Sequence, residues 1–246
     1  MLFLALLFVS FQLAVAQTSS LVQPDVAIFY PKDFKAYKTL PSLAVTQDVS
    51  QEKPLPANWA VKPQFLQIEG KNAVQFTFPE HVDLYGTGEV LGDLRRNGTD
   101  VTLWNTDNYE YGKFEGKQLY QAHPWVLGVR KDGSSFGILA DHSWRQQIVL
   151  DDKVTFISEG PTFRVLVIEK DSPQEVMKAL GELTGTMAMP PLWALGYQQS
   201  RYSYYPDTSV KELADEFRSR KIPADVIWMD IDYMDGFRVF TFDKEG

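Results

Sequence analysis

The chain has 246 residues, of which 44% are hydrophobic and 23% charged, a composition typical of a globular protein that can bury a sizeable core. Its formal net charge of -8 disfavours nucleic acid and anionic membrane surfaces as partners, because both are polyanions that attract basic proteins. The absence of cysteine excludes disulfides, thiolate metal sites and a cysteine nucleophile.

The first 16 residues have the pattern of a secretory signal peptide. An almost unbroken apolar run extends from Leu2 to Phe11, and Ala14-Val15-Ala16 matches the small residues that precede a signal peptidase cleavage site. The run is too short to span a membrane, and no later segment approaches the ~20 apolar residues that a spanning helix needs. The sequence therefore predicts a secreted or exported protein without a membrane span.

The next segments differ in their periodicity. Residues 17–60 show little of it, which predicts a poorly ordered or edge-lying entry segment. From about Val61, short β-branched and aromatic runs alternate with turn residues, and this pattern predicts a β-sandwich over residues 61–186. The strands expected within it are 73–78, 134–140, 146–150, 154–158 and 162–169.

Two glycine-containing stretches of this region have a structural and a functional interpretation. Asn97-Gly98-Thr99 matches a glycosylation sequon, but Asn-Gly is also a turn signal, and we favour the turn. Gly86, Gly88 and Glu89 are expected to form a turn and not a phosphate loop, because no helix follows them.

The period then changes to that of a helix. Ser172-Pro173-Gln174-Glu175 is a capping box with proline at the first helical position, and Val176, Leu180 and Leu183 share one face before Gly185. We expect this helix to bridge two domains. Residues 187–191 are expected to be an extended linker, because Pro190 and Pro191 exclude a helix.

A new architecture is predicted over residues 187–246. We expect a strand at 194–198, a loop at 201–206, a helix capped by Ser209 and ending near Pro223, and a second strand at 226–233. Strand, helix and strand form a parallel βαβ unit, and a (β/α)₈ TIM barrel contains eight strands. We therefore expect the start of a truncated barrel, whose C-terminal part would belong to a longer protein.

The acidic run from Asp225 to Asp235 is the strongest candidate for chemistry. In a strand that continued through it, Trp228, Asp230 and Asp232 would point to one face, at the end of a barrel strand where active sites are built. A hydrogen-bonded acidic pair that ties loops together is the structural alternative. A metal site is less favoured, because no histidine or third acidic ligand is clearly placed.

Two aromatic clusters could contact a sugar. Residues 192–205 and 103–109 combine aromatic rings with amide, hydroxyl and charged groups, which suit the apolar faces and the hydroxyls of a carbohydrate. An aromatic core explains the first cluster equally well, and an Asx-turn explains the polar residues of the second.

Several motifs, taken in order, resemble glycoside hydrolase family 31. They are Tyr85-Gly86-Thr87-Gly88-Glu89, residues 103–107, Gly137-Ile138-Leu139, residues 191–198, Arg201-Tyr202-Ser203-Tyr204 and residues 228–234. The resemblance covers the chain from about Lys62 onward. It implies an α+β multi-domain protein, in which a galactose-mutarotase-like β-sandwich precedes the first two strands of the barrel.

The resemblance also implies a function. Members of the family are retaining α-glycosidases, so the expected ligand is an oligosaccharide or α-glucoside, with no cofactor and no metal. By position in the family, Asp107, Tyr202, Asp230 and Ile231 would bind the sugar. The family's nucleophile and acid/base motifs do not occur in this chain, so no catalytic residue is expected and the chain alone is expected to be inactive. A non-catalytic carbohydrate-binding module and a metal-dependent glycosyltransferase are the alternatives.

Overall fold

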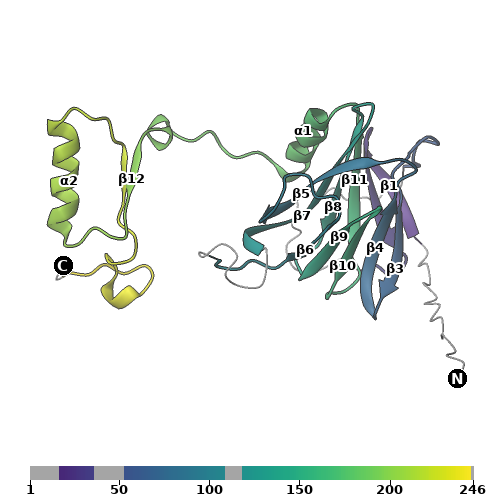
Figure 1. Ribbon diagram of the computed structural model, residues 1–246, viewed down its shortest axis with the longest axis horizontal. Coiled ribbons are helices and arrows are strands. Elements are labelled where there is room, and N and C mark those ends of the chain that lie inside the picture. The colour runs from purple at the N-terminus through teal and green to yellow at the C-terminus, as the bar shows by residue number, and fades with distance from the viewer. Residues whose placement is uncertain (1–16, 36–52, 109–117, 245–246) are drawn as a thin grey trace, which may run out of the picture. The chain divides into compact units, whose positions relative to one another are not determined.

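The computed structural model of the protein describes residues 17–35, 53–108 and 118–244 (Figure 1). The predicted signal peptide at 1–16 lies outside these ranges. The chain divides into two compact units, Met1–Thr186 and Met187–Gly246, and each is described by itself. Within the described ranges, no helix has the length and apolar character needed to cross a membrane.

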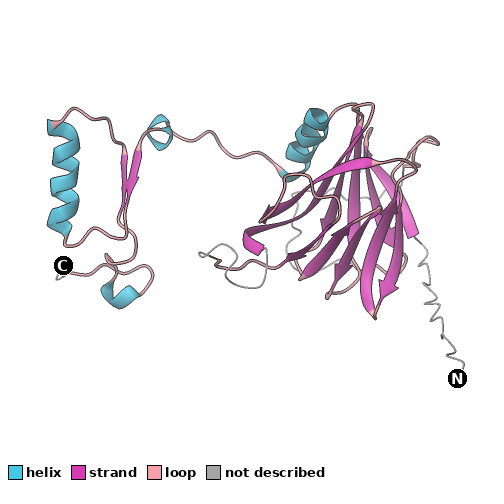
Figure 2. Ribbon diagram, in the orientation of Figure 1, coloured by secondary structure: helices cyan, strands magenta, loops and turns pink. Residues whose placement is uncertain are grey.

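The first unit is a sandwich of two antiparallel sheets, which confirms the predicted β-sandwich (Figure 2). In one sheet the strand order is β1 (Gln17–Gln23), β2 (Val26–Pro31), β11 (Arg164–Lys170), β8 (Ser135–Asp141), β7 (Gln118–Arg130) and β5 (Val82–Val90). In the other it is β3 (Pro63–Ile68), β4 (Lys71–Thr77), β10 (Lys153–Ser158), β9 (Gln146–Leu150) and β6 (Thr99–Leu103).

Apolar side chains from both sheets meet in the main core. Phe76 of β4 and Phe156 of β10 lie edge to face with ring centroids 6.5 Å apart, and both are fully buried. The two sheets meet where Phe78 stacks on Phe136 of β8 at 4.8 Å. Each buried aromatic ring removes a large apolar area from water, so this cluster provides much of the sandwich's stability.

Residues 17–60 were predicted to be a poorly ordered or edge-lying entry segment, and the described part of this segment contains two strands, with β1 at the edge of a sheet. The strands β1 and β2 belong to the six-stranded sheet, and β2 pairs with β11. On β2, Ala27 and Phe29 face the main core, whereas Val26 and Ile28 belong to a second apolar cluster. Because both faces of the strand are buried, the run lacks the alternation that identifies a half-buried strand.

The helix α1 (Pro173–Thr184) forms the other side of that second cluster. Val176, Ala179 and Leu183 are buried with Ile28 and Leu166 of the six-stranded sheet, and α1 lies beside that sheet in Figure 1. The helix therefore belongs to the first unit, so the expectation that it bridges two domains was wrong. The single apolar stripe of α1 explains why it packs on one unit only, because an amphipathic helix needs to bury just one face.

The predicted cap of α1 is present. Ser172 has extended backbone angles, its side chain accepts a hydrogen bond from the N–H of Glu175 at 3.3 Å, and Gly185 follows the helix with a φ of 82°. Replacing Ser172 by alanine should lower the free energy of unfolding by about 1 kcal/mol, because one helical N–H loses its acceptor. Urea unfolding should show this loss, whereas Ser172→Asp, which keeps an acceptor, should stay near wild type. An equal loss in both variants would contradict a capping role.

The second unit is a parallel βαβ unit, as predicted, but its elements begin and end elsewhere. A 3₁₀ turn, η1 (Leu192–Leu195), occupies the start of the expected first strand at 194–198, and the strand β12 is Gln198–Ser200. The helix α2 (Asp207–Ser219) begins two residues before the expected Ser209 cap and has no side-chain cap. The second strand β13 is only Val226–Trp228 and pairs in parallel with β12.

Backbone and side-chain contacts hold β12, α2 and β13 together. The Tyr197 ring lies 5.8 Å from the Phe217 ring of α2, and the Tyr197 carbonyl accepts the N–H of Asp225 at 3.0 Å. The indole of Trp228 donates to the side-chain oxygen of Gln198 at 2.8 Å. Because β12 and β13 are parallel, their carboxyl ends lie at the same edge.

Candidate functional site

The loops that follow β12 and β13 carry three of the four predicted sugar-binding residues. Tyr202 lies after β12, and Asp230 and Ile231 lie after β13. The Ser203 hydroxyl donates to Asp232 Oδ2 at 2.5 Å, so a hydrogen bond joins the two loops next to these residues. The structure thus places the three residues in one loop cluster at the carboxyl ends of parallel strands, where α/β folds position their ligand-binding groups.

The expected alternation of Trp228, Asp230 and Asp232 along one strand was wrong. The strand β13 ends at Trp228, and Asp230 has a left-handed φ of 60°, which breaks an extended run. Few non-glycine residues adopt this conformation, although aspartate tolerates it better than most. Asp230 and Asp232 therefore belong to a turn of the chain, and Asp232 is the loop-tying carboxylate that the structural alternative described.

The aromatic cluster at 192–205 is mostly exposed within its unit. Trp193, Tyr202 and Tyr205 each expose more than half of their surface, so the alternative of a simple aromatic core does not hold within this unit. Tyr204 is only partly exposed, and its hydroxyl accepts a hydrogen bond from the Gln199 side-chain amide at 3.0 Å. Exposed rings beside amide and hydroxyl groups are the combination that sugar-binding surfaces use.

Asp107, the fourth predicted residue, lies in the first unit. It is exposed in the loop after β6, and its Oδ1 accepts a hydrogen bond from the Tyr120 hydroxyl at 2.7 Å. The loop is tied to β7 by the Thr106 N–H, which donates to the Leu119 carbonyl at 2.9 Å. Sequence reasoning missed Tyr120, because the residues that separate it from Asp107 along the chain gave no signal of the contact. Tyr109, at the end of the predicted polar cluster, lies outside the described residues.

A hollow of about 530 Å³ lies next to the same loop. Trp104 and Trp144 line it and are both more than half exposed, and Asn105 adds an amide. Gln146 lies at its base, where the side-chain Nε2 donates to the His142 carbonyl at 2.8 Å. The other amide atom of Gln146, Oε1, is buried and has no partner among the described residues. Trp144 was not predicted, since a single tryptophan after a strand carries no pattern of its own.

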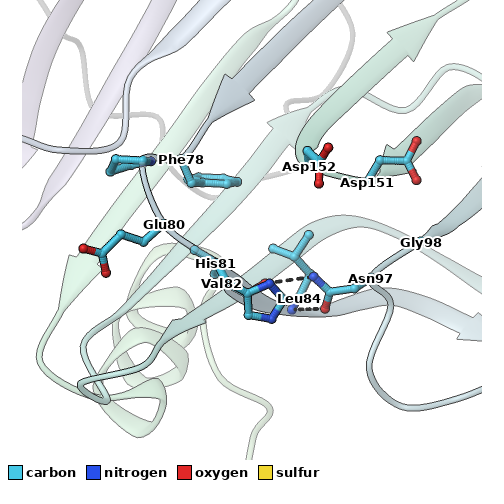
Figure 3. Close-up of a pocket in the computed structure, with 10 residues that line it drawn as sticks. Phe78, Glu80, His81, Val82, Leu84, Asn97, Gly98, Asp151 and Asp152 are labelled. Atoms are coloured by element: carbon cyan, nitrogen blue, oxygen red, sulfur yellow. Dashed lines mark hydrogen bonds between the residues drawn. The ribbon is translucent and has the colours of Figure 1, made fainter.

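A second hollow, of about 650 Å³, lies between the turn after β4 and the β9–β10 turn (Figure 3). Glu80, His81 and Asp152 line it, together with Asn97, whose amide is already engaged by the fold. Asn97 accepts the N–H of Leu84 at 2.9 Å and donates to the Val82 carbonyl at 2.8 Å, as the dashed lines in Figure 3 show. None of the predicted site residues lines this hollow.

The Asn97-Gly98 pair forms the predicted turn, and Gly98 has a φ of 74°. The Asn97 nitrogen that a glycan would modify is the donor to the Val82 carbonyl, which agrees with the structural interpretation. Gly86 and Gly88, in contrast, were wrongly expected to form a turn. They belong to β5 and have positive φ angles of 108° and 87° at irregularities of its pairing with β7.

The described residues contain no group of three or more histidine, aspartate or glutamate side chains that could hold a metal ion. The one strongly shifted histidine among them is His142, in which burial lowers the pKa to about 4 while the adjacent Asp141 acts in the opposite direction. At neutral pH this imidazole is uncharged. The loop at 104–107 carries amide, hydroxyl and carboxylate groups, and the loops at 201–206 and 229–234 add the guanidinium of Arg201 to groups of the same kinds. Such groups can bind the hydroxyls of a neutral ligand.

Two family models match the chain. The model of the glycosyl hydrolase 31 N-terminal galactose mutarotase-like domain matches residues 67–148, and that of the glycosyl hydrolases family 31 TIM-barrel domain matches residues 187–246. The matches fall in the sandwich and in the βαβ unit, respectively.

Individual proteins show the same similarity. Alpha-glucosidase 2 of Bacillus thermoamyloliquefaciens is 40% identical over 194 residues, which are 74% of this chain and 24% of that protein. The crystal structure of a family 31 alpha-glucosidase from Bacteroides thetaiotaomicron is 57% identical, with a TM-score of 0.62 over 68% of this chain and 29% of the other. A Flavobacterium johnsoniae dextranase shares the fold, with a TM-score of 0.73 at 20% identity over 91% of this chain and 34% of the other. The chain thus spans about a quarter of the length of the curated relative.

Proposed function

Since this chain belongs to glycoside hydrolase family 31, we propose that it binds oligosaccharides with α-glucosidic bonds through Asp107, Tyr202, Asp230 and Ile231. The observation that carries the proposal is the Ser203–Asp232 hydrogen bond. It joins the loop that bears Tyr202 to the loop that bears Asp230, at the carboxyl ends of two parallel strands. The alpha-glucosidases among the relatives support the choice of an α-linked glucoside as ligand.

The chemistry of each residue suits a role in binding. The carboxylates of Asp107 and Asp230 can each accept hydrogen bonds from two sugar hydroxyls. The exposed ring of Tyr202 offers a flat apolar surface to the C–H face of a pyranose, and Ile231 adds apolar contact. The left-handed backbone of Asp230 also supports the proposal, because strained conformations of non-glycine residues cluster at ligand sites.

We assign these carboxylates to binding and not to bond cleavage. A retaining glycosidase needs two carboxyl groups about 5 to 5.5 Å apart on opposite sides of the scissile bond. Asp232 is engaged by Ser203 within the loop cluster, and the sequence motifs of the family's nucleophile and acid/base do not occur in the chain. Hydrolysis, with retention at the anomeric carbon, is proposed as the activity of the family's complete catalytic site. Export is proposed from the apolar run at Leu2–Phe11.

Titration calorimetry with maltose tests the binding proposal. The 246-residue chain should bind maltose and should bind cellobiose, its β-linked isomer, more weakly. Asp230→Asn and Asp107→Ala should each weaken maltose binding about thirtyfold, because a hydrogen bond to a charged group contributes about 2 kcal/mol. Glu212→Gln, an exposed charge of α2, serves as the matched control and should bind like wild type.

Two results would overturn the proposal. The first is maltose binding that neither Asp230→Asn nor Asp107→Ala weakens. The second concerns cleavage. The chain should release no p-nitrophenol from p-nitrophenyl α-glucoside. If the wild-type chain releases it and Asp230→Asn does not, Asp230 is catalytic.

A further inference from the structure

A chain of side-chain contacts leads from the sheet to Asp107. The Tyr120 hydroxyl donates to Asp107 Oδ1 at 2.7 Å, and the Tyr120 backbone N–H donates to Glu89 Oε2 at 3.1 Å. Tyr120 belongs to β7 and Glu89 to β5, so two strands of the six-stranded sheet hold a loop residue in place. Both bonds are exposed, and each has a carboxylate acceptor, which strengthens it.

An irregularity in the β5–β7 pairing puts Tyr120 in this position. Gly88 pairs with Ala122 and Val90 pairs with Gln118, so Glu89 alone lies opposite three residues of β7. The extra residues of β7 leave the regular ladder of backbone hydrogen bonds. The N–H of Tyr120 therefore donates to the Glu89 carboxylate and not to a backbone carbonyl of β5. Bulges of this kind redirect a side chain, and they are common beside ligand sites.

Gly88 is required for this close approach. Its φ is 87°, and a Cβ at this position would lie 2.5 Å from the Gln121 carbonyl oxygen and 2.7 Å from the His123 nitrogen. Both are backbone atoms, which cannot move aside cheaply. The glycine therefore permits the geometry that Glu89 then stabilises.

We propose that Tyr120 is a positioning residue, which holds the Asp107 carboxylate in the orientation that accepts a sugar hydroxyl. The proposal rests on the proposed function, in which Asp107 binds the ligand. An exposed aspartate samples several rotamers, and fixing one of them before binding removes an entropic cost of association. The Tyr120 bond engages Oδ1, and a carboxylate has lone pairs on both oxygens, so Oδ2 can accept the ligand's hydroxyl.

The bond from Tyr120 also changes what Asp107 can select. A carboxylate held at Oδ1 presents its second oxygen in one direction, so it favours one hydroxyl position over its epimer. We therefore expect Tyr120 to affect discrimination as well as affinity. Two disaccharides measure this discrimination. One is maltose, and the other is its C4 epimer, in which an α-linked galactose replaces the non-reducing glucose.

The test is a double-mutant cycle in the 246-residue chain, with maltose binding measured by calorimetry. Tyr120→Phe, which removes only the hydroxyl, should weaken binding about fivefold. In the Asp107→Ala background the same change should have much less effect, because the bond between Tyr120 and Asp107 is already absent. Tyr85→Phe, the same chemical change on β5, is the matched control and should bind like wild type.

The outcomes separate this inference from the function it rests on. If neither Asp107→Ala nor Asp230→Asn weakens maltose binding, the proposed function fails. If Asp230→Asn weakens binding and Asp107→Ala does not, the positioning role fails while the function stands. If Asp107→Ala weakens binding and Tyr120→Phe does not, or if Tyr120→Phe acts equally in both backgrounds, the positioning role fails while the function stands. Glu89→Ala provides a second variant, which should weaken binding about twofold to fivefold by releasing the Tyr120 backbone.

Discussion

Replacing Phe156 by alanine should lower the free energy of unfolding of the sandwich by about 3 to 5 kcal/mol. Phe156 is fully buried on β10, edge to face with Phe76, and it pairs with Val74 and Ile148 of the adjacent strands. The variant loses the apolar transfer energy of the ring and leaves a cavity that the rigid sheets cannot close. Urea unfolding followed by circular dichroism of the strands measures the loss.

The neighbouring residue on β10 provides the control. Ile157 is only partly buried on the opposite face of the strand, so Ile157→Ala should cost much less than Phe156→Ala. Phe156→Leu, which keeps most of the apolar volume, should fall between the two. If the midpoint shifts of Phe156→Ala and Ile157→Ala were equal, Phe156 would not belong to the central contact of the core.

Strong local patterns predicted the sandwich well. The strand expected at 146–150 is β9 without any shift, and the capped helix expected from Ser172 is α1. Sequence patterns failed to predict elements whose formation depends on tertiary contacts. The strand β2 was missed because its second face is buried in the apolar cluster that also includes α1, and a strand buried on both faces shows no alternation.

The second unit shows the opposite error, in which a pattern continued beyond its element. Residues 226–233 alternate like a strand, but Asp230 has a left-handed φ and the pairing with β12 ends at Trp228. Ser209 resembles a helix cap, yet α2 begins at Asp207. The preceding residue is Pro206, which has no N–H to donate within a helix. Alternating side chains and capping residues indicate which secondary structure a segment favours, whereas the pairing between strands determines where a strand ends.

The candidate site was only partly accessible to sequence reasoning. Asp107, Tyr202, Asp230 and Ile231 came from ordered motifs, and the Ser203–Asp232 bond that joins two of their loops followed only from the structure. Tyr120 depends on an irregular strand pairing, which no local pattern encodes. Residues that position others through long-range contacts are therefore the part of a site that sequence patterns miss most readily.

His142 lines the hollow beside Trp144 and contacts buried groups of the sandwich. Its Nε2 lies 2.5 Å from the Ser158 hydroxyl, which in turn accepts the N–H of Gly160 at 3.0 Å. The imidazole stacks on Phe163, with centroids 5.0 Å apart and planes at 17°. The Ser158 hydroxyl has one proton that it can donate to Nε2 of a neutral ring while it accepts the Gly160 N–H.

Burial makes the stability of the sandwich depend on pH through His142. Its pKa is lowered from 6.5 to about 4 in the folded protein, so between these values the unfolded chain binds a proton that the folded one does not. Stability from this group is complete above pH 6.5 and falls as the pH drops toward 4. The free energy of unfolding should decrease by about 2 to 3 kcal/mol between pH 7 and pH 4.5.

The matched variant for this pH dependence is His142→Gln, which keeps an acceptor for Ser158 but does not titrate. Carboxylates also titrate over this range, and the comparison removes their contribution, because they are common to both proteins. Urea unfolding at pH 7 and pH 4.5 should show a loss about 2 to 3 kcal/mol larger in wild type than in His142→Gln. Equal losses would mean that His142 titrates in the folded protein as it does in the unfolded chain, so that burial does not lower its pKa.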